Sequence, residues 1–469
     1  MNTLIVSFFF LIVLIFFRSL INLVKLFSNL AWLRKYKINS QKLKSSKDNF
    51  IICIPMLREQ KIVLKTIEYF SKLNYPKDKY KIYIVTTSRE LKESDKNSNH
   101  QSTYELASVC ASKVNKKLKM NLVEIVNYSG VGKLMSHQIN YVIKMMAKRK
   151  ENLKSIFAVY NADSRPNLNT LSAVSSTLRG YEKDMGIIPN IVQQSSLFTL
   201  NFNNFSNSPK GYVLRAAAIF QTKWTLIHEL SRFRKQSLKA IKKSKGILSQ
   251  LFDTQLSHCV GHGLFVRLSL LSKEFLPTET LNEDLPFGYY QCCKREPILP
   301  FPMLENSEVP LSITSLINQK KVWFFPYLEY DKCQKRVVRL KRYKSLTEVY
   351  LLTLQGQLTG LIWLFQSAIL FIPLMIAFYL QSILLLSIWT LGMFLYWFLP
   401  VGIIYLNLNF LESIAGKTMT KISFPNYVRT SFAGIFLLIT HSVGPIMATY
   451  DFVTAKYFDK PVIKLKTER

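Results

Sequence analysis

The chain has 469 residues and carries 62 Lys and Arg against 29 Asp and Glu, so its formal net charge at pH 7 is +33. This length allows two or three domains. Hydrophobic residues make up 49% of the chain but concentrate in residues 3–17 and from about 349 to 450. This distribution excludes a wholly soluble protein and indicates a soluble domain between membrane anchors.

The first apolar segment, residues 3–17, is followed by Arg18 and then by further apolar residues. No basic region precedes it and no small-residue cleavage pattern follows it, which favours a retained anchor over a signal peptide. We therefore predict an N-terminal transmembrane anchor over residues 1–33. The basic residues at 34–37 predict that the middle of the chain is cytoplasmic.

The second apolar region, residues 345–452, is predicted to form transmembrane helices with an interfacial segment. Residues 358–380 and 382–408 are each long enough to cross a bilayer, and residues 431–450 are a shorter third candidate. Three crossings would place the basic tail, residues 453–469, outside the cell, against the positive-inside rule. Either 431–450 is re-entrant or the apolar block folds into another crossing, and the sequence leaves both open.

The six cysteines contain no C-x-x-C pair, and Cys292 and Cys293 are adjacent, which suits a structural disulfide poorly. We expect six free thiols, as in a reduced cytosolic domain.

The middle of the chain, residues 48–330, alternates between strand and helix patterns. Strands are predicted at residues 50–55, 80–86, 122–126 and 156–160, with spaced apolar positions for helices at 62–70 and 139–145. This order predicts an α/β fold with a mostly parallel sheet wrapped by helices. In such sheets the ligand binds beyond the carboxyl ends of the strands. Four residues fall at those ends: Pro55, Thr86, Gly130 and Asp163.

Two other patterns argue for different chemistry. Residues 130–133 suggest a phosphate loop, but Leu134 occupies the place of the required Ser or Thr. His258, Cys259 and His262 suggest a zinc site, but no fourth ligand stands nearby at a suitable spacing. The sequence therefore favours neither a Walker-type nucleotide loop nor a zinc site.

Asp163 has two interpretations. The residues around it suit a turn, so its carboxylate can serve as a helix N-cap. Its position at the end of a strand instead favours a role in binding or catalysis, because a carboxylate is costly in apolar surroundings unless it binds a metal or performs chemistry. The second interpretation is preferred.

Six segments in order resemble the membrane-integrated family-2 glycosyltransferases, the inverting group that includes hyaluronan, chitin and cellulose synthases. They are Ile51-Ile52-Cys53-Ile54-Pro55-Met56-Leu57-Arg58-Glu59, the stretch from Gly132-Lys133 to Asn140, Asn161-Ala162-Asp163 in the place of D-x-D, Gly261-His262-Gly263, Asn282-Glu283-Asp284 in the place of T-E-D, and Gln319-Lys320-Lys321-Val322-Trp323 in the place of Q-x-x-R-W. The resemblance spans nearly the whole chain and places the apolar helices where the family has them.

The resemblance implies a cytoplasmic domain of the GT-A type that binds a nucleotide-sugar, by expectation a UDP-sugar, together with Mg²⁺ or Mn²⁺. Asp163 would hold the metal, which stabilises the leaving diphosphate as a Lewis acid. Asp284 would be the general base that takes the acceptor's proton, with Glu283 orienting it. The donor and its diphosphate would contact Pro55, Glu59, Lys133, Asp163, Gln319, Lys320 and Lys321. The acceptor would contact Gly261, His262, Gly263 and Trp323, whose ring suits stacking on a sugar, although Trp323 also suits an interfacial anchor.

The chain departs from the family pattern at four places. Asn161 replaces the first Asp of D-x-D, which leaves Asp163 as the charged ligand of that motif. Val322 stands where the family has Arg, and the ammonium group of Lys320 or Lys321 lacks the guanidinium fork. The second strand ends in Thr86-Thr87-Ser88 rather than in Asp, and Asn282 replaces the Thr of T-E-D.

The expected function is a membrane-bound inverting glycosyltransferase of polysaccharide biosynthesis, a hexosyltransferase that adds sugars processively and exports the polymer through its own helices. A second enzyme hypothesis is the transfer of one sugar to a lipid-linked acceptor at the cytoplasmic face. No nucleic-acid partner is expected in either case. The departures at Asn161 and Val322 also permit a pseudoenzyme.

A hypothesis from another class is a basic, membrane-anchored binding module that recruits nucleic acid or anionic lipid without catalysis. Residues 232–245 contain seven Lys or Arg with apolar residues between them. They suit a helix near anionic headgroups and equally a solvated helix.

Overall fold

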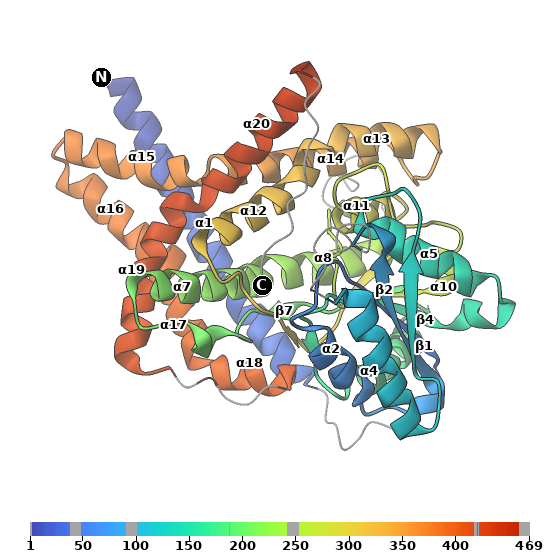
Figure 1. The fold of residues 1–469 in the computed structure, drawn as a ribbon. Helices are drawn as coiled ribbons and strands as arrows, with labels where there is room; N and C mark the ends of the chain where they lie inside the picture. Colours follow the sequence, from blue (N-terminus) through green and yellow to red (C-terminus); the bar gives the residue numbers. More distant parts are fainter. Residues whose placement is uncertain are drawn as a thin grey trace.

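The computed structural model describes residues 2–37, 48–90, 101–186, 188–241, 253–416, 420 and 422–458. Figure 1 shows an α/β region with strands β1, β2 and β4 on one side of the molecule and a group of long helices, among them α1, α16, α19 and α20, on the other. The helices α8 and α12 lie between these two parts, and α7 lies beside α17 and α19 among the long helices.

The α/β region is built on a seven-stranded sheet in the order β3-β2-β1-β4-β8-β6-β9. Its strands are β1 (Phe50–Pro55), β2 (Tyr80–Thr87), β3 (Val123–Tyr128), β4 (Ile156–Val159), β6 (Ile191–Gln193), β8 (Leu264–Arg267) and β9 (Ile298–Pro300). β1 to β4 are parallel to one another, β8 is antiparallel to β4 and β6, and β9 is parallel to β6. The four predicted strands and the mostly parallel sheet are confirmed.

Alternation along each strand gives the sheet two apolar faces. In β1, Ile52 and Ile54 pack with one buried cluster and Ile51 and Cys53 with another, as the two-residue period of a strand requires. One cluster includes side chains of α2 (Val63–Ser71), α4 (Thr103–Leu118) and α6 (Thr170–Met185), and the other those of α5 (Met135–Ala147). Both faces are thus covered by helices, which is usual for parallel strands.

A second, three-stranded sheet lies beyond the end of β4. Its order is β5-β10-β7, with β5 (Arg165–Pro166), β10 (Glu305–Asn306) and β7 (Ser196–Leu197). β10 pairs antiparallel to β5 and parallel to β7. This small sheet brings residue 305 next to the turn that follows β4, although 140 positions separate the two in the chain.

The remaining described elements are mostly helices. They are α1 (Asn2–Lys35), η2 (Lys77–Lys79), η3 (Lys150–Lys154), η4 (Phe202–Asn204), α7 (Pro209–Trp224), the π-helix η5 (Thr225–Glu229), α8 (Leu230–Ile241), α10 (Leu268–Leu271), α11 (Asp284–Cys293), α12 (Ile313–Leu328), α13 (Tyr330–Arg339), α14 (Leu346–Leu364), α15 (Gln366–Tyr379), α16 (Ile383–Met393), the π-helix η6 (Phe394–Phe398), α17 (Leu399–Leu406), α18 (Leu408–Ala415), α19 (Phe424–Ile439), η7 (Thr440–Ser442) and α20 (Val443–Phe458).

Within the described residues, three helical runs are long and apolar enough to cross a membrane: Phe10–Lys35, Ile383–Leu406 and Phe424–Phe458. α14 and α15 satisfy the same test only as a pair and are bent by 48° at Phe365. The predicted straight crossing at 358–380 is therefore broken, and the predicted short segment 431–450 is part of a run of 35 residues.

The basic helix α8 is partly buried and contacts the α/β region. Leu230, Phe233, Gln236 and Ser237 are buried, and the Gln236 side chain bonds the backbone on both sides of the loop before β9, at Glu296 and Ile298. On the same helix, Arg234 donates to Asn29 of α1 at 2.6 Å. α8 therefore links the anchor helix to the sheet. Residues 242–252 and the end of the basic tail, 459–469, lie outside the described residues.

All six cysteines are buried free thiols, as expected from their spacing. Burial raises the pKa of Cys292 to about 12, which keeps its thiol protonated.

Candidate functional site

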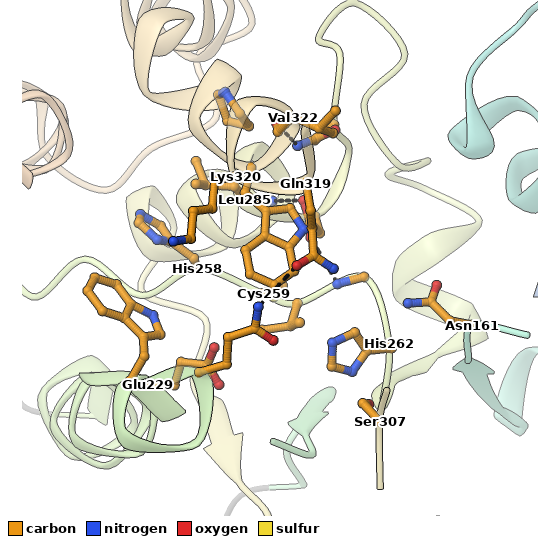
Figure 2. Close-up of a pocket in the computed structure, with 18 of the residues that line it drawn as sticks. Asn161, Glu229, His258, Cys259, His262, Leu285, Ser307, Gln319, Lys320 and Val322 are labelled. Carbon is orange, nitrogen blue, oxygen red and sulfur yellow. Dashed lines mark hydrogen bonds between the residues drawn. The ribbon is translucent and has the colours of Figure 1, made fainter. Parts of the chain in front are cut away.

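A cavity of about 340 Å³ lies where the carboxyl end of β4 meets α11, α12 and the long apolar helices. At one end, which we call the sheet end, it is lined by Asn161, Asp163, Gly261, His262, Glu283, Asp284, Ser307 and Glu308. At the other, the helix end, it is lined by Phe220, Gln221, Trp224, Lys320, Trp363 and His441. Figure 2 shows Asn161, His262 and Ser307 on one side of the pocket and Lys320 and Glu229 on the opposite side.

The structure brings most of the predicted site residues to this cavity. Its walls include Asp163, Gly261, His262, Glu283, Asp284, Gln319, Lys320 and Trp323. The other predicted residues are not among its lining: Pro55, Glu59, Lys133, Gly263 and Lys321.

Asp284 is the first residue of α11, and its carboxylate is held by two backbone N–H groups. The N–H of Gly261 donates to Oδ2 at 2.9 Å, and the N–H of Leu285 donates to Oδ1 at 2.8 Å. A carboxylate is also favoured at a helix N-terminus by the helix dipole. These two bonds fix the orientation of the carboxylate.

Gly261 allows the loop before β8 to approach these acidic residues closely. A Cβ at this position would lie 3.3 Å from Oδ2 of Asp284 and 3.6 Å from Oε1 of Glu283. A side chain would therefore crowd both carboxylates. The neighbouring Gly263 has a φ of +61°, and a Cβ there would meet Gln194 at 2.8 Å. Glycine at both positions therefore allows the loop to pass close to its neighbours.

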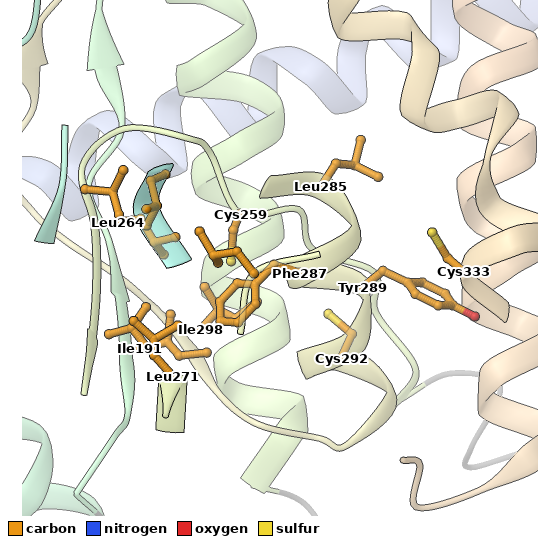
Figure 3. Close-up of a cluster of buried hydrophobic side chains, with 14 of the residues drawn as sticks. Ile191, Cys259, Leu264, Leu271, Leu285, Phe287, Tyr289, Cys292, Ile298 and Cys333 are labelled. Carbon is orange, nitrogen blue, oxygen red and sulfur yellow. The ribbon is translucent and has the colours of Figure 1, made fainter. Parts of the chain in front are cut away.

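Helix α11 is anchored by an apolar cluster that fixes the position of Asp284. Figure 3 shows Leu285, Phe287 and Tyr289 of this helix projecting into a cluster that also contains Cys259 and Ile298. A Cβ on Gly288 would lie 2.3 Å from the backbone nitrogen of Cys259. Because α11 packs directly on the 258–259 backbone, the helix and the loop that bonds Asp284 cannot shift independently.

The loop before α11 is also tied to α12 and its C-terminal cap. The Asn282 amide donates to the carbonyl of Val322 at 2.9 Å, and the N–H of Leu281 donates to Glu329 at 3.0 Å. Val322, which replaces the family's Arg, therefore contributes a backbone acceptor to the site.

Asp163 lies in the turn after β4 and is only 6% exposed. The turn is closed by Ser164, whose N–H donates to the carbonyl of Asn161 at 3.1 Å. The next helix, α6, begins at Thr170 with Asn169 as its N-cap residue, so Asp163 does not cap it. Asp163 and Asn161 both face the cavity, which is the position that the strand-end interpretation requires.

The oxygen atoms at the sheet end suit Mg²⁺ or Mn²⁺ held jointly with a phosphate ligand. In the described parts of the chain there is no group of three or more His, Cys, Asp or Glu side chains that could hold a metal. Mg²⁺ is usually bound by one or two carboxylates together with substrate phosphates rather than by a protein cage. Asp163 with the amide oxygen of Asn161 meets that requirement.

His262 faces the cavity and is held from behind by a buried carboxylate. Its Nδ1 lies 2.5 Å from Oε1 of Glu305 in β10, and Glu305 is fully buried. The hydroxyls of Ser196 and Ser164 donate to the same oxygen at 3.0 and 3.3 Å. Burial by itself lowers the pKa of His262, but the charge and hydrogen bond of Glu305 outweigh burial and raise it. The imidazole is therefore oriented and biased toward its protonated form.

The structure does not assemble His258, Cys259 and His262 into a metal site. His258 Nε2 lies 2.5 Å from the Tyr330 hydroxyl, and His262 faces Glu305 instead. Burial lowers the pKa of His258, so its ring is neutral.

The predicted donor residues at the end of β1 belong to a separate loop. Arg58 has a φ of +55°, and its N–H donates to Glu90 at 2.7 Å. Glu90 also accepts from the N–H of Thr103 at 2.8 Å, and the N–H of Glu59 donates to the Thr103 hydroxyl at 2.9 Å. These bonds fix the loop on α4. Lys133 is exposed in the loop after β3.

Successive residues of helix α12 contact different parts of the molecule. Gln319 accepts from the Gln221 amide of α7 at 3.0 Å, and Lys320 projects into the cavity. Lys321 is directed elsewhere and forms an ion pair with Asp451 of α20. Trp323 lines the cavity and remains 38% exposed, as a stacking surface must.

Several lining residues were not predicted from the sequence: Glu229, Glu308, Trp363 and His441. Glu229 ends the π-helix η5, and burial raises its pKa, although His262 and Arg232 act in the opposite direction. π-bulges occur frequently at functional sites, but no sequence pattern marks this one. Glu305 was also missed, since a single Glu in a two-residue strand leaves no periodic signal.

No protein-family model matches the sequence, and no match is found among curated proteins. Among solved structures, the mannosyltransferase PcManGT from Pyrobaculum calidifontis in complex with GDP-Man and Mn²⁺ has a TM-score of 0.41 at 12% identity, over 92% of this chain and 99% of that chain. S. aureus TarS 1-349 has a TM-score of 0.36 at 12% identity, over 67% and 72% of the two chains. The same TarS fragment in complex with UDP has a TM-score of 0.34 at 11% identity, over 90% and 97%. Likeness at this level does not define a common fold, so the function of this chain is argued from its own residues.

Proposed function

We propose that the protein is a membrane-associated inverting glycosyltransferase that uses a nucleotide-sugar donor. The observation that carries the proposal is that Asp163, after β4, and Asp284, at the start of α11, open onto one cavity. Their segments were singled out in the sequence by the D-x-D-like and T-E-D-like motifs, which lie about 120 positions apart in the chain. A binding module without catalysis gives no reason for the buried carboxylate of Asp163 and the half-buried carboxylate of Asp284 to share a pocket.

In this proposal Asp284 is the general base. The acceptor hydroxyl must lose a proton as it attacks the sugar, and a fixed carboxylate within hydrogen-bond reach accepts it. The N–H groups of Gly261 and Leu285 hold the carboxylate in a fixed orientation. Glu283 beside it adds a second acceptor that orients the incoming hydroxyl.

Asp163 and Asn161 would hold Mg²⁺ or Mn²⁺ together with the donor phosphates, and the bound ion would neutralise charge on the leaving diphosphate. His262 lies at the same end of the cavity, and its ring orientation is set by Glu305. Protonated, it places a further positive charge where negative charge develops. This positive charge would compensate for Asn161, which stands in the place of the first Asp of the D-x-D motif.

Two acceptor classes remain within the proposal. A growing polysaccharide is supported by the exposed face of Trp323 in the cavity and by the apolar helices beside it. The second candidate, a lipid-linked acceptor that receives one sugar, is favoured by the helix end of the cavity, where a buried lysine stands among aromatic rings. Product size separates them, because only the first gives long chains.

We further propose that the bent pair α14–α15 crosses the membrane as one span. The N–H of Lys344 before α14 donates to Cys293 of α11, and the carbonyl of Ala415 in α18 accepts from Asn306. Both ends of the segment 344–415 therefore contact the α/β region. If Ile383–Leu406 crosses, a return crossing must precede it, and α14–α15 supplies it.

The test is a screen of nucleotide-sugars with the purified full-length protein in detergent, which measures release of free nucleotide with Mg²⁺, with Mn²⁺ or with a chelator. Turnover of one donor class, lost on chelation, is the expected result. Absence of turnover with every donor, in the presence of polysaccharide and lipid acceptors, would refute the enzymatic proposal.

A further inference from the structure

The helix end of the cavity lies where three helical runs are interrupted. α7 passes into the π-helix η5 at Thr225, α14 and α15 break at Phe365, and α19 and α20 are joined through η7 at Thr440–Ser442. Trp224, Trp363 and His441 stand beside these interruptions and line the cavity. Irregular backbone among membrane helices is tolerated where it lines a cavity.

Hydrogen bonds fix two of these breaks to each other. The Ser442 hydroxyl donates to the carbonyl of Trp363 at 3.2 Å, and the Ser367 hydroxyl donates to the carbonyl of Leu438 at 2.9 Å. The rings of Trp363 and His441 are stacked at 5.6 Å, and the ring of Phe220 lies 4.6 Å from that of His441. The aromatic walls of this end are therefore held in place before any ligand arrives.

The same walls carry polar atoms that the protein does not satisfy. Nε1 of Trp363, Nδ1 of His441 and Oε1 of Gln221 are buried and have no hydrogen-bond partner within the described chain. A buried donor or acceptor without a partner lowers the stability of the protein. The Trp363 N–H and, as the Nδ1–H tautomer, the His441 ring can donate to a ligand from outside the chain, whereas Oε1 of Gln221 needs a donor.

Lys320 adds a positive charge to this group. Its side chain is only 4% exposed, and its Nζ lies 5.8 Å from the centre of the Phe220 ring. No carboxylate pairs with it among the residues that the structure describes. Burial lowers the pKa of Lys320 to about 7, and an anion placed beside the amine would favour its charged form.

We propose that the helix end of the cavity binds the phosphate group of a lipid acceptor, with the Lys320 amine, the Trp363 indole N–H and the His441 ring as its donors. The inference rests on the proposed glycosyltransferase function and names the acceptor class for it. It reassigns Lys320 from the donor diphosphate, where the family resemblance had placed it, to the acceptor.

The location favours a lipid phosphate over the donor diphosphate or free phosphate. Asp163, the expected donor-side ligand, lies at the sheet end, and Figure 2 shows Lys320 on the far side of the pocket from Asn161 and His262. The outer surface beside the two breaks is apolar. Large apolar side chains are exposed there: Leu361, Ile362 and Phe365 next to Trp363, and Phe436, Ile439 and Val443 next to His441. An acyl or isoprenoid chain leaving the cavity between these helices meets a surface suited to lipid.

The experiment titrates the purified full-length protein in detergent with phytanyl phosphate, with phytanol and with inorganic phosphate, and follows the fluorescence of the pocket tryptophans. Phytanyl phosphate is expected to bind at least about 10-fold more tightly than phytanol, since hydrogen bonds to a charged group are the stronger kind. Inorganic phosphate is expected to bind far more weakly than the lipid and to displace it poorly.

Lys320→Gln should weaken phytanyl phosphate binding about 10-fold or more while leaving the weak binding of phytanol unchanged. Lys320→Arg should restore most of the affinity, and Lys335→Gln, an exposed charge change on α13, should have no effect. If Lys320→Gln does not fold, as judged by size-exclusion chromatography, Trp363→Phe keeps the ring, removes the N–H and should cost a few-fold in affinity.

The inference is overturned if phytanol binds as well as its phosphate, if inorganic phosphate accounts for the binding, or if neither variant changes the affinity. It is also overturned if UDP-sugar binding, rather than lipid binding, is lost in Lys320→Gln. Nucleotide release from the donor without acceptor is measured in parallel. Loss of the lipid result with donor turnover intact refutes only the inference, whereas absence of turnover with lipid binding intact refutes the proposed function.

Discussion

The side chains that line the two ends of the cavity differ in how completely the protein satisfies their polar groups, although Oε2 of Glu305, behind His262, has no partner among the described residues. At the sheet end, the carboxylate of Asp284 accepts two backbone N–H groups and His262 is paired with Glu305. At the helix end, Lys320 has no carboxylate partner and Trp363 and His441 hold unpaired nitrogen atoms, within the described residues. The first arrangement is pre-organised for chemistry, which gains most from groups that need not move. The second is completed only by a ligand.

The largest effect should come from Asp284→Asn, which keeps the size of the side chain but removes the base and can accept only one of the two N–H groups that now hold the carboxylate. A general base contributes typically about 10²–10⁴-fold, so we expect kcat to fall by that factor with donor affinity little changed. The measurement is nucleotide release at saturating donor, with thermal unfolding as the folding control. If kcat were unchanged, Asp284 would not be the general base, and the chemical role proposed for the sheet end would be refuted.

Asp163→Asn tests whether this end holds the metal. Loss of the charged ligand should weaken Mn²⁺ binding in the presence of donor nucleotide by roughly 10–100-fold, and activity should fall with it. Electron paramagnetic resonance titration of free Mn²⁺ measures the affinity independently of turnover. Equal Mn²⁺ affinity in the variant would show that the metal, if used, sits elsewhere. Lys335→Gln is the matched surface control.

Gly261→Ala tests how finely the base is positioned. The new methyl group would lie 3.3 Å from Oδ2 of Asp284, so the carboxylate must move by a few tenths of an ångström. Misplacement of a catalytic group by about 1 Å can cost about 10²-fold, and a smaller shift should cost roughly 10-fold in kcat. The kinetic comparison uses the donor and acceptor found in the screen. A variant with wild-type kcat would show that the loop only lines the pocket.

The smallest expected effect is a pH-dependent one on stability. The pKa of His262 is raised in the folded state, so the pair with Glu305 contributes fully below the unfolded-state pKa of about 6.5. This contribution is lost as the pH rises through the folded-state pKa. His262→Gln should therefore lower the unfolding temperature more at pH 5.5 than at pH 9, as measured by thermal unfolding at the two pH values.

Glu305→Gln serves as the partner variant and should show the same trend, because either change removes the charge pair. If the difference in unfolding temperature between wild type and variant grew with rising pH, the assignment of the charge to His262 would be contradicted.

Four strands of the seven-stranded sheet, β1 to β4, could be predicted because each is a short apolar run between turn residues, as at Phe50–Pro55 and Ile156–Val159. The strands β6, β8 and β9, of only three or four residues each, were not predicted. The acidic motifs could be singled out because few acidic residues occur in a basic chain. The partner of His262 could not be predicted, since Glu305 reaches it only through the pairing of β10 with β5 and β7. The break at Phe365 was missed for a similar reason. The carbonyl of Trp363 beside the break accepts from the hydroxyl of Ser442, which comes 79 positions later in the chain.

The sequence by itself determined the alternation of strands and helices, the long apolar runs and the two acidic segments, since these depend on local periodicity and composition. Only the tertiary structure decided which charges meet. Lys320 and Lys321 are neighbours in the chain, yet one faces the cavity and the other pairs with Asp451. Successive residues on a helix point about 100° apart, so the packing of α12 against α20 and the cavity, and not the residue type, assigns each lysine its role.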